Sequence, residues 1–386
     1  MDHYLFFFGR TPGLSLAELR AFIPTAELFD EHTGSVKGTS VRIDGVVRPM
    51  ENLIAYLGGT IKIARVVSEP SVITQSELVG HIDSETEKEC VFALTSLTSR
   101  WIPDQSILRA IKDELSHKYP KVRYLISRHE SGVSNVAIKK ERAVELTVLE
   151  KGETFVIART VSIQNVDVWA QREYDRPYAD AKAGMLPVKV ARMVVNIGLG
   201  TEAKSKVLLD PFCGMGTILG ETAERQASAL GSDIDEEVVR KANGNLRWLL
   251  KAFGYTTKVE IVKADAVHAS ERLVPNSIDA IVTEPFLGST KLGEGKITQR
   301  EDIKNIVKGL AKLYKGCLKD WHTILKPGGK IVMAFPSIMK ETSVYSPVKS
   351  IIDSCEILGY TKLLGPLSYH RPDAIVRREF FVFEKK

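Results

Sequence analysis

After Pro187 the sequence alternates regularly between short apolar runs and helical patterns, and this feature most constrains the fold. Strands that alternate with helices in this way are typical of a doubly wound parallel sheet. Pro187 suits the first turn of a helix, so we expect it to open the first helix of this region. The five apolar runs are VLLD (207–210), SALGSD (228–233), KVEIVKAD (258–265), SIDAIVTE (277–284) and GKIVMAFP (329–336).

The stretch LLDPFCGMGTILGE, residues 208–221, places a strand, a glycine-rich turn and the start of a helix in direct succession. Gly214 and Gly216 would let the backbone approach a ligand where a side chain would collide. The spacing departs from the dinucleotide fingerprint, because Gly220 comes one residue late. Asp210, ahead of the turn, suits a cationic ligand better than a pyrophosphate. The stretch therefore favours S-adenosylmethionine, which carries an ammonium and a sulfonium group.

Further acids stand at the ends of the next two strands. Asp233 ends the second strand, where a carboxylate can bind ribose hydroxyls, and Asp235 is a helix N-cap. Asp265 ends the third strand, where it could meet an adenine amino group. Each acid alone could be a cap or a turn residue, but three at consecutive strand ends predict a binding site. The candidate cofactor-binding residues are Asp210, Phe212, Gly214, Gly216, Asp233, Asp265 and Ala266.

The first 165 residues show a different succession of predicted strands and helices. We expect a strand over 4–9, a helix that begins at Ser15 with Glu18 as its capping-box partner, and a turn at Gly58-Gly59 that leads into a strand. A second α/β unit follows. It comprises a strand over 90–97, a helix over 105–119, a strand over 122–129 and a hairpin over 145–163 that turns at Lys151-Gly152.

The bulk properties describe an ordinary globular protein. The chain has 386 residues, enough for two or three domains, and its net charge of +5 suits a polyanionic partner without requiring one. We find no apolar run of the ~20 residues that a membrane span needs and no signal-peptide pattern at the N-terminus. The four cysteines are scattered without a CxxC pair. We therefore expect free thiols, no metal site and a cytoplasmic location.

The fourth strand ends in IVTEPFLG, residues 281–288. The glycine loop followed later by an acid and a proline at a strand end resembles the class I S-adenosylmethionine-dependent methyltransferases that act on exocyclic amino nitrogens of nucleobases. Their tetrapeptide is Asp or Asn, Pro, Pro, aromatic. The resemblance implies that Glu284 and Pro285 orient the amine and that Phe286 packs on the flipped base. A register one residue earlier would put Thr283 at the acid position, and we prefer Glu284.

Two longer stretches extend the resemblance. YLFFFGRTPGLSLAELRAF (4–22) is similar to the opening of the THUMP-containing tRNA guanosine-N2 methyltransferases, which modify guanosine 10 in archaea and eukaryotes. RPYADAKAGMLPVKVARMVVNIG (176–198) resembles the segment that leads into their catalytic domain. Within this group the chain most resembles bacterial proteins known only as RNA methylases.

The resemblance implies an α/β fold: a C-terminal class I, Rossmann-like methyltransferase domain preceded by an α+β RNA-binding region. We expect four segments. These are a ferredoxin-like unit over 1–68, a THUMP-like RNA-binding domain over 69–165, a connector over 166–186 with contacts of its own, and the methyltransferase domain over 187–386.

The resemblance also implies a tRNA substrate and leaves open an activating partner subunit. Single basic residues are usually solvated, but as a group Lys118, Lys121, Arg123, Arg128, Lys139, Lys140 and Arg142 are candidates for phosphate contacts. Arg172 and Arg176 could touch RNA or cofactor. The predicted function is N2-methylation of guanosine in tRNA. The alternatives are a DNA amino-methyltransferase and a catalytically silent RNA-binding protein of the same fold.

Overall fold

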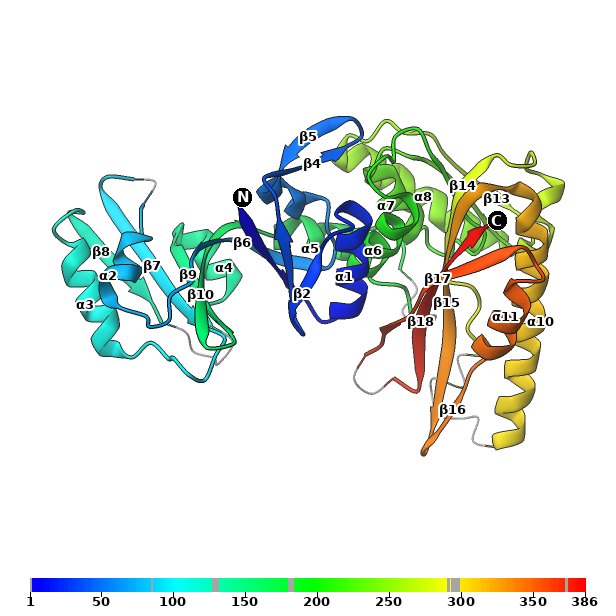
Figure 1. Cartoon of the computed structure of the whole chain (residues 1–386). Helices are drawn as coiled ribbons and strands as arrows, with labels where there is room; N and C mark the ends of the chain where they lie inside the picture. The colour runs from blue at the N-terminus through cyan, green and yellow to red at the C-terminus, as the bar shows by residue number, and fades with distance from the viewer. Residues whose placement is uncertain are drawn as a thin grey trace.

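The computed structural model describes residues 2–84, 86–126, 132–179, 184–289, 292, 299–371 and 374–386. The molecule is elongated, with the segment from α2 to β10 at one end and the C-terminal sheet with its helices at the other (Figure 1). Among the described residues, no helix combines the length and apolar character that a membrane span requires. All four cysteines are buried free thiols, as expected.

The C-terminal half forms an eight-stranded sheet among the described residues. Seven strands follow the order β13-β12-β11-β14-β15-β18-β17, and β16 pairs with the carboxyl end of β15. The strands from β13 to β15 are parallel, and β18 runs antiparallel to both of its neighbours. The predicted parallel sheet is therefore confirmed. Its strands are β11 (Val207–Asp210), β12 (Ser228–Asp233), β13 (Val259–Lys263), β14 (Ile278–Thr283), β15 (Leu325–Lys340), β16 (Ser343–Tyr345), β17 (Tyr360–Tyr369) and β18 (Val376–Lys385).

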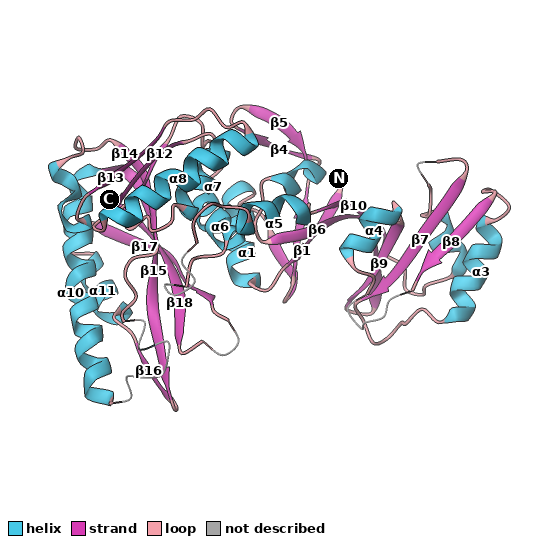
Figure 2. Cartoon of the chain, turned by 180° about the vertical axis from the view of Figure 1, so that it is seen from behind, coloured by secondary structure: helices cyan, strands magenta, loops and turns pink. Residues whose placement is uncertain are grey.

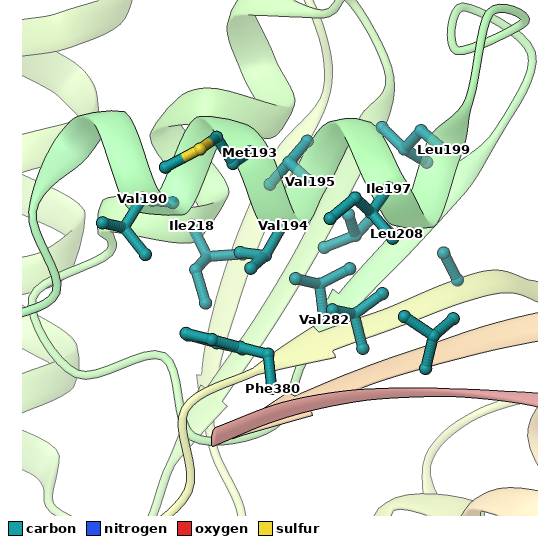
Figure 3. Close-up of a cluster of buried hydrophobic side chains, with 14 of the residues drawn as sticks. Val190, Met193, Val194, Val195, Ile197, Leu199, Leu208, Ile218, Val282 and Phe380 are labelled. Carbon is teal, nitrogen blue, oxygen red and sulfur yellow. The ribbon is translucent and has the colours of Figure 1, made fainter. Parts of the chain in front are cut away.

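Helices cover both faces of this sheet. Successive residues of a strand point to opposite faces, so both sets of apolar side chains are buried. On β18, Phe380 and Val382 pack against α6, whereas Phe381 and Phe383 pack against α10. Figure 3 shows the α6 side, where Val194 and Ile218 lie above the sheet residues. The helices are α6 (Val188–Leu199), α7 (Thr217–Glu224), α8 (Glu236–Phe253), η2 (Ala266–Glu271), α10 (Arg300–Ile324) and α11 (Val348–Cys355).

The N-terminal half forms one continuous eight-stranded sheet in the order β2-β3-β1-β6-β10-β9-β7-β8. The strands are β1 (His3–Phe8), β2 (Glu27–Asp30), β3 (Thr33–Lys37), β6 (Thr60–Ser68), β7 (Glu89–Ser96), β8 (Lys121–Leu125), β9 (Val144–Lys151) and β10 (Thr154–Ile163). A separate hairpin joins β4 (Ser40–Ile43) to β5 (Val46–Pro49). The strand that follows Gly58-Gly59 and the hairpin at Lys151-Gly152 are confirmed.

The pairing of β6 with β10 joins the two expected N-terminal units into this one sheet. Their division at residue 68 stays a proposal. The helical elements of this half are α1 (Pro12–Phe22), η1 (Met50–Ala55), α2 (Gln75–Gly80), α3 (Gln105–Leu115) and α4 (Asn135–Glu141).

The predicted capping box at Ser15 and Glu18 is wrong. Both residues lie inside α1, whose N-cap is Thr11. The Ser15 hydroxyl donates to the Thr11 carbonyl oxygen at 2.8 Å. Glu18 is fully buried and accepts hydrogen bonds from the backbone N–H groups of Gly58 and Gly59, both at 2.8 Å. The acidic side chain therefore serves a tertiary contact and not the start of its own helix.

Glu18 also connects the N-terminal half to the C-terminal half. The Asn196 side-chain amide on α6 donates to Glu18 Oε1 at 2.6 Å, and burial raises the pKa of Glu18 to about 7. The Gly58-Gly59 backbone lies directly against α6, since a side chain at Gly58 would place its Cβ 2.4 Å from the Lys189 carbonyl oxygen. Through these contacts α1 and the Gly58-Gly59 turn pack against α6. Figure 2 shows α1 beside α6.

The connector contains a helix, α5 (Val166–Tyr174), and makes contacts of its own, as expected. Arg172 is buried and pairs with Glu221 on α7 at 2.5 Å, and Arg192 on α6 pairs with the other oxygen of Glu221 at 2.6 Å. Glu173 accepts a hydrogen bond from the Val188 N–H at 2.8 Å, which caps α6. The connector thus fixes both helices that lie next to the glycine-rich loop.

We predict that Gly58→Ala lowers the free energy of unfolding by about 2–3 kcal/mol, because the added Cβ would collide with the backbone of α6. Gly13→Ala is the matched control. No atom lies within 4 Å of its Cβ position, and alanine favours the helix by about 0.5 kcal/mol. Urea unfolding measures both variants. Equal stability of the two would contradict the close contact.

Candidate active site

Four acids lie at the carboxyl edge of the parallel sheet. Asp210 and Asp233 end β11 and β12, Asp265 follows β13, and Glu284 follows β14. These four strands are neighbours in the sheet, so their ends line up along one edge. The residues come from distant parts of the chain, and ligands of open α/β sheets bind at this edge.

Asp210 is the most buried of the four acids, with 1% of its surface exposed. Its Oδ1 accepts a hydrogen bond from the Thr283 hydroxyl at 2.6 Å and another from the Phe212 N–H at 3.2 Å. Burial raises the pKa of Asp210 to about 7, and the negative charges of Asp233 and Glu284 act in the same direction. A cationic ligand at this position would relieve that charge repulsion.

The glycine-rich loop leaves open space next to these acids. Gly214 has a φ of +49°, and a Cβ added there would meet no atom within 4 Å. The Gly214 N–H donates to Asp233 Oδ2 at 3.2 Å, which ties the loop to the end of β12. Gly216, with a φ of +83°, is the N-cap of α7. Both glycines therefore adopt the left-handed backbone conformation that side chains disfavour.

The remaining predicted cofactor-binding residues surround the same edge. Asp235 is an N-cap, as expected, and accepts hydrogen bonds from two N–H groups of α8. Asp265 is exposed, although its side chain also accepts a hydrogen bond from the Val267 N–H at 3.1 Å. Ala266 is buried, and its carbonyl oxygen accepts a hydrogen bond from Trp321 at 2.8 Å. The Phe212 ring meets Trp321 edge-on at 6.4 Å.

Glu284 has an arginine partner from the other end of the domain. Arg378 on β18 donates its Nε–H to Glu284 Oε1 at 2.5 Å, and its Nη2 donates to the Gly184 carbonyl oxygen. The Glu284 side chain is 18% exposed. Burial raises the pKa of Glu284, and Arg378 opposes that rise. No hydrogen bond among the described residues reaches Glu284 Oε2, so this oxygen is available to a ligand.

The residues after Glu284 differ in exposure. Pro285 is buried, and no hydrogen bond among the described residues reaches its carbonyl oxygen. The Phe286 side chain is 57% exposed. The next carbonyl, that of Phe286, accepts a hydrogen bond from the buried Tyr314 hydroxyl of α10 at 2.6 Å. The loop therefore presents an acceptor oxygen and an aromatic ring while α10 holds its backbone.

Sequence reasoning missed three residues that position this site: Thr283, Tyr314 and Arg378. Thr283 is fully buried and its hydroxyl donates to Asp210, so its side chain supports Asp210 and does not take the acid position of the tetrapeptide. The VRREFF pattern of β18 could have drawn attention to Arg378, because two arginines interrupt an apolar strand. No local pattern singles out the Tyr314 hydroxyl.

The structure corrects the expectation for Arg172 and locates Arg176. Arg172 is 4% exposed and forms a structural ion pair with Glu221, so RNA cannot reach it. The Arg176 guanidinium donates to the Thr217 hydroxyl at 3.1 Å, at the first residue of α7. It therefore supports the helix that follows the glycine-rich loop.

The predicted RNA-binding residues fall into three groups. Lys118, Lys121 and Arg123 are already paired with acids: Lys118 with Asp83, and the other two with Glu89. Arg128 lies outside the described residues. The remaining three cations, on and just after α4, are exposed and form no ion pair among the described residues: Lys139, Lys140 and Arg142.

Comparisons with known proteins agree with this geometry. A model of the family described as RMKL-like, methyltransferase domain, matches residues 176–350. A protein of Methanothermococcus thermolithotrophicus named "Probable tRNA (guanine(10)-N2)-dimethyltransferase" is 35% identical over 147 residues, which cover 37% of this chain and 82% of that protein. The chain belongs to the THUMP-containing tRNA guanosine-N2 methyltransferase family.

Other relatives of this family match over shorter shares. The tRNA (guanine(10)-N2)-dimethyltransferase of Methanothermobacter thermautotrophicus is 30% identical over 202 residues, 52% of this chain and 51% of that protein. The mouse U6 snRNA (guanine-N(2))-methyltransferase THUMPD2 is 32% identical over 130 residues, 33% of this chain and 20% of that protein. The chain spans about half the length of the curated relatives it matches first.

A solved structure supports the fold over the whole length. The crystal structure of TrmN from Thermus thermophilus aligns over 100% of both chains, with a TM-score of 0.52 at 17% identity. The α/β architecture, with a Rossmann-like methyltransferase domain after an N-terminal α+β region, is therefore confirmed.

We predict that the destabilisation caused by Arg378→Ala grows as the pH rises. Burial raises the folded-state pKa of Glu284 above its unfolded value, so its ionisation costs stability as the pH rises. Arg378 offsets that cost by pairing with the ionised form. The loss in free energy of unfolding should be about 1–3 kcal/mol larger at pH 8 than at pH 5.

Urea unfolding at the two pH values measures this difference. Arg377→Ala is the matched control, because Arg377 lies on the same strand and forms no ion pair among the described residues. Its effect on stability should be the same at both pH values. An Arg378→Ala effect that does not change with pH would show that Arg378 does not stabilise the Glu284 charge.

Proposed function

We propose that this protein is an S-adenosylmethionine-dependent RNA methyltransferase that methylates the N2 nitrogen of guanosine in tRNA. The observation that carries the proposal is the position of Glu284. Its carboxylate lies at the same sheet edge as Asp210, close enough for its charge to act on Asp210, and it is held by Arg378 with one oxygen available. The names of the relatives support the substrate and the nitrogen.

The residues at the sheet edge fit S-adenosylmethionine. The buried Asp210 would face its cationic methionine part, and the open space beside Gly214 would admit that part without a clash. Asp233 would accept hydrogen bonds from the ribose hydroxyls, and Asp265 with Ala266 would meet the adenine ring. Ile234 is 68% exposed between these acids and offers an apolar surface to a flat ring.

The cofactor supplies a methyl group on a positively charged sulfur. Glu284 would accept an N–H hydrogen bond from the exocyclic amine, and the Pro285 carbonyl oxygen would accept the second. These two acceptors fix the nitrogen lone pair in line with the methyl group, and such orientation is the main requirement of an in-line displacement. The Glu284 charge also stabilises the positive charge that develops on the nitrogen. Phe286 would stack on the base.

A carboxylate favours guanine over adenine at this site. Guanine carries a ring N–H beside its exocyclic amine, so both groups donate hydrogen bonds. Adenine carries a ring acceptor beside its amine, which would face the lone pairs of a carboxylate. An ionised glutamate offers acceptors alone. An ionised Glu284 therefore complements the two donors of the guanine edge better than the donor and acceptor of the adenine edge.

Finer features stay predictions. The three exposed cations of the α4 region, Lys139, Lys140 and Arg142, are the best remaining candidates for RNA contacts in the N-terminal half. Modification of position 10 rests on the names of the relatives. An activating partner subunit rests on the family resemblance, and a cytoplasmic location rests on the scattered cysteines and the lack of a signal-peptide pattern. The silent RNA-binding protein is disfavoured, because a half-buried arginine keeps the Glu284 carboxylate in place.

We predict that Glu284→Ala lowers kcat for methyl transfer to unmodified tRNA by about 100-fold or more, because the amine loses its charged acceptor. S-adenosylhomocysteine binding should change by less than about 2-fold, since Glu284 is assigned to the substrate amine. Glu284→Asp keeps a carboxylate that is one carbon shorter and should lose less, about 10-fold. Isothermal titration and a single-turnover assay separate the two effects. Full turnover in Glu284→Ala would remove Glu284 from the mechanism.

We also predict that cofactor binding depends on pH through Asp210. The pKa of Asp210 is about 7 in the free protein, and a cationic ligand stabilises the ionised form. A proton must therefore be released on binding below pH 7, so the affinity should fall about 10-fold from pH 8 to pH 6. Calorimetry with S-adenosylmethionine measures this change. In Asp210→Asn the binding should be weaker and its dependence on pH should disappear. A persisting dependence would assign it to another group.

A further inference from the structure

Five lysines follow one face of α10 and form what we name the α10 lysine stripe: Lys304, Lys308, Lys312, Lys315 and Lys319. Their spacings of four, four, three and four residues place the lysines of successive turns on the same face of the helix. At 3.6 residues per turn, the five Cα atoms fall within about 80° of the helix circumference and span about 22 Å. Four of the five side chains are exposed, and Lys315 is partly exposed.

The stripe lies on the opposite side of α10 from its buried face. The core-facing residues are Leu310, Tyr314, Cys317 and Trp321, which lie fully or almost fully buried against the sheet and η2. The lysines are therefore not a by-product of core packing. The lysines therefore face away from the core, and α10 itself runs along the outer edge of the molecule in Figures 1 and 2.

The stripe is almost without acids. Lys304 lies 3.8 Å from Glu301, and none of the other four lysines forms an ion pair within the described part of the chain. An exposed helix usually gains stability from opposite charges at i,i+3 and i,i+4, whereas like charges at those spacings destabilise it. Each neighbouring pair in the stripe is a like-charge pair. The helix thus retains a repulsive arrangement that a polyanion would relieve.

We propose that the α10 lysine stripe binds the phosphate backbone of the RNA substrate. This inference rests on the proposed function. A double helix carries about a dozen phosphates over the length of the stripe, and lysine is suited to such contacts because it binds phosphate as a point charge. Contacts of this kind orient the substrate without reading its sequence.

The position of α10 connects these phosphate contacts to the active site. Its buried face holds the catalytic loop through the hydrogen bond from Tyr314 to Phe286, so backbone contacts on its outer face act on the element that supports the active site. The exposed cations Lys139, Lys140 and Arg142, on and just after α4, lie in the segment from α2 to β10 at the other end of the molecule (Figure 1). A large folded RNA can contact both surfaces, whereas a free nucleotide cannot.

The test measures binding of unmodified tRNA to the full-length protein at several salt concentrations, without turnover. In Lys308→Gln/Lys312→Gln we expect about 10-fold weaker binding at 0.1 M salt. The slope of log K against log salt should also become shallower by about 1.5, because each lost phosphate contact contributes about 0.7–0.9. The melting temperature should not fall, because the substitutions remove like-charge repulsion on an exposed helix face. The S-adenosylhomocysteine affinity should stay unchanged, since both lysines lie outside the catalytic site.

The matched control is Lys251→Gln/Lys258→Gln, which removes two other exposed lysines of the same domain and changes the net charge equally. This control should bind tRNA like the unmodified protein. Unchanged affinity in the stripe variant overturns the proposal, and so does an equal loss in both variants, which would show a net-charge effect. If the unmodified protein binds tRNA but transfers no methyl group, the proposed function fails and the stripe result still stands.

Discussion

A buried carboxylate joins the two halves of this molecule. Glu18 accepts hydrogen bonds from the Gly58-Gly59 backbone and from Asn196, so it links α1 and the first sheet to α6 of the methyltransferase domain. A buried acid without partners would be strongly destabilising, and these three donors satisfy it. The N-terminal half and the domain that carries the proposed cofactor site are therefore packed directly against each other.

The catalytic end depends on a second set of long-range contacts. Thr283 links the acid of the glycine-rich loop to the strand that carries the catalytic loop, and Arg378 holds Glu284 from the last strand. Glutamate is one carbon longer than the aspartate of the related motif, and the arginine fixes the longer side chain. This pairing is a physical reason why an altered tetrapeptide can work.

The sequence could predict the elements whose determinants are local. The helix-strand alternation predicted the parallel sheet, and acids at successive strand ends predicted the site edge, because parallel strands align their ends. Contacts between distant residues could not be read in this way. Ser15 and Glu18 have the spacing of a capping box, yet Glu18 accepts hydrogen bonds from the Gly58-Gly59 backbone and, across the domain joint, from Asn196. Arg172 looked like a candidate ligand contact, but Glu221, far along the chain, pairs with it in the interior.

The central claim is that this site methylates the exocyclic amine of guanine in RNA. It is tested most directly by transfer of a labelled methyl group from S-adenosylmethionine to unmodified tRNA, with an equal mass of DNA as control, followed by digestion and separation of the nucleosides. We expect the label in N2-methylguanosine or N2,N2-dimethylguanosine from tRNA and none in DNA. Label in any other nucleoside, or none in tRNA although the cofactor binds, would contradict the claim.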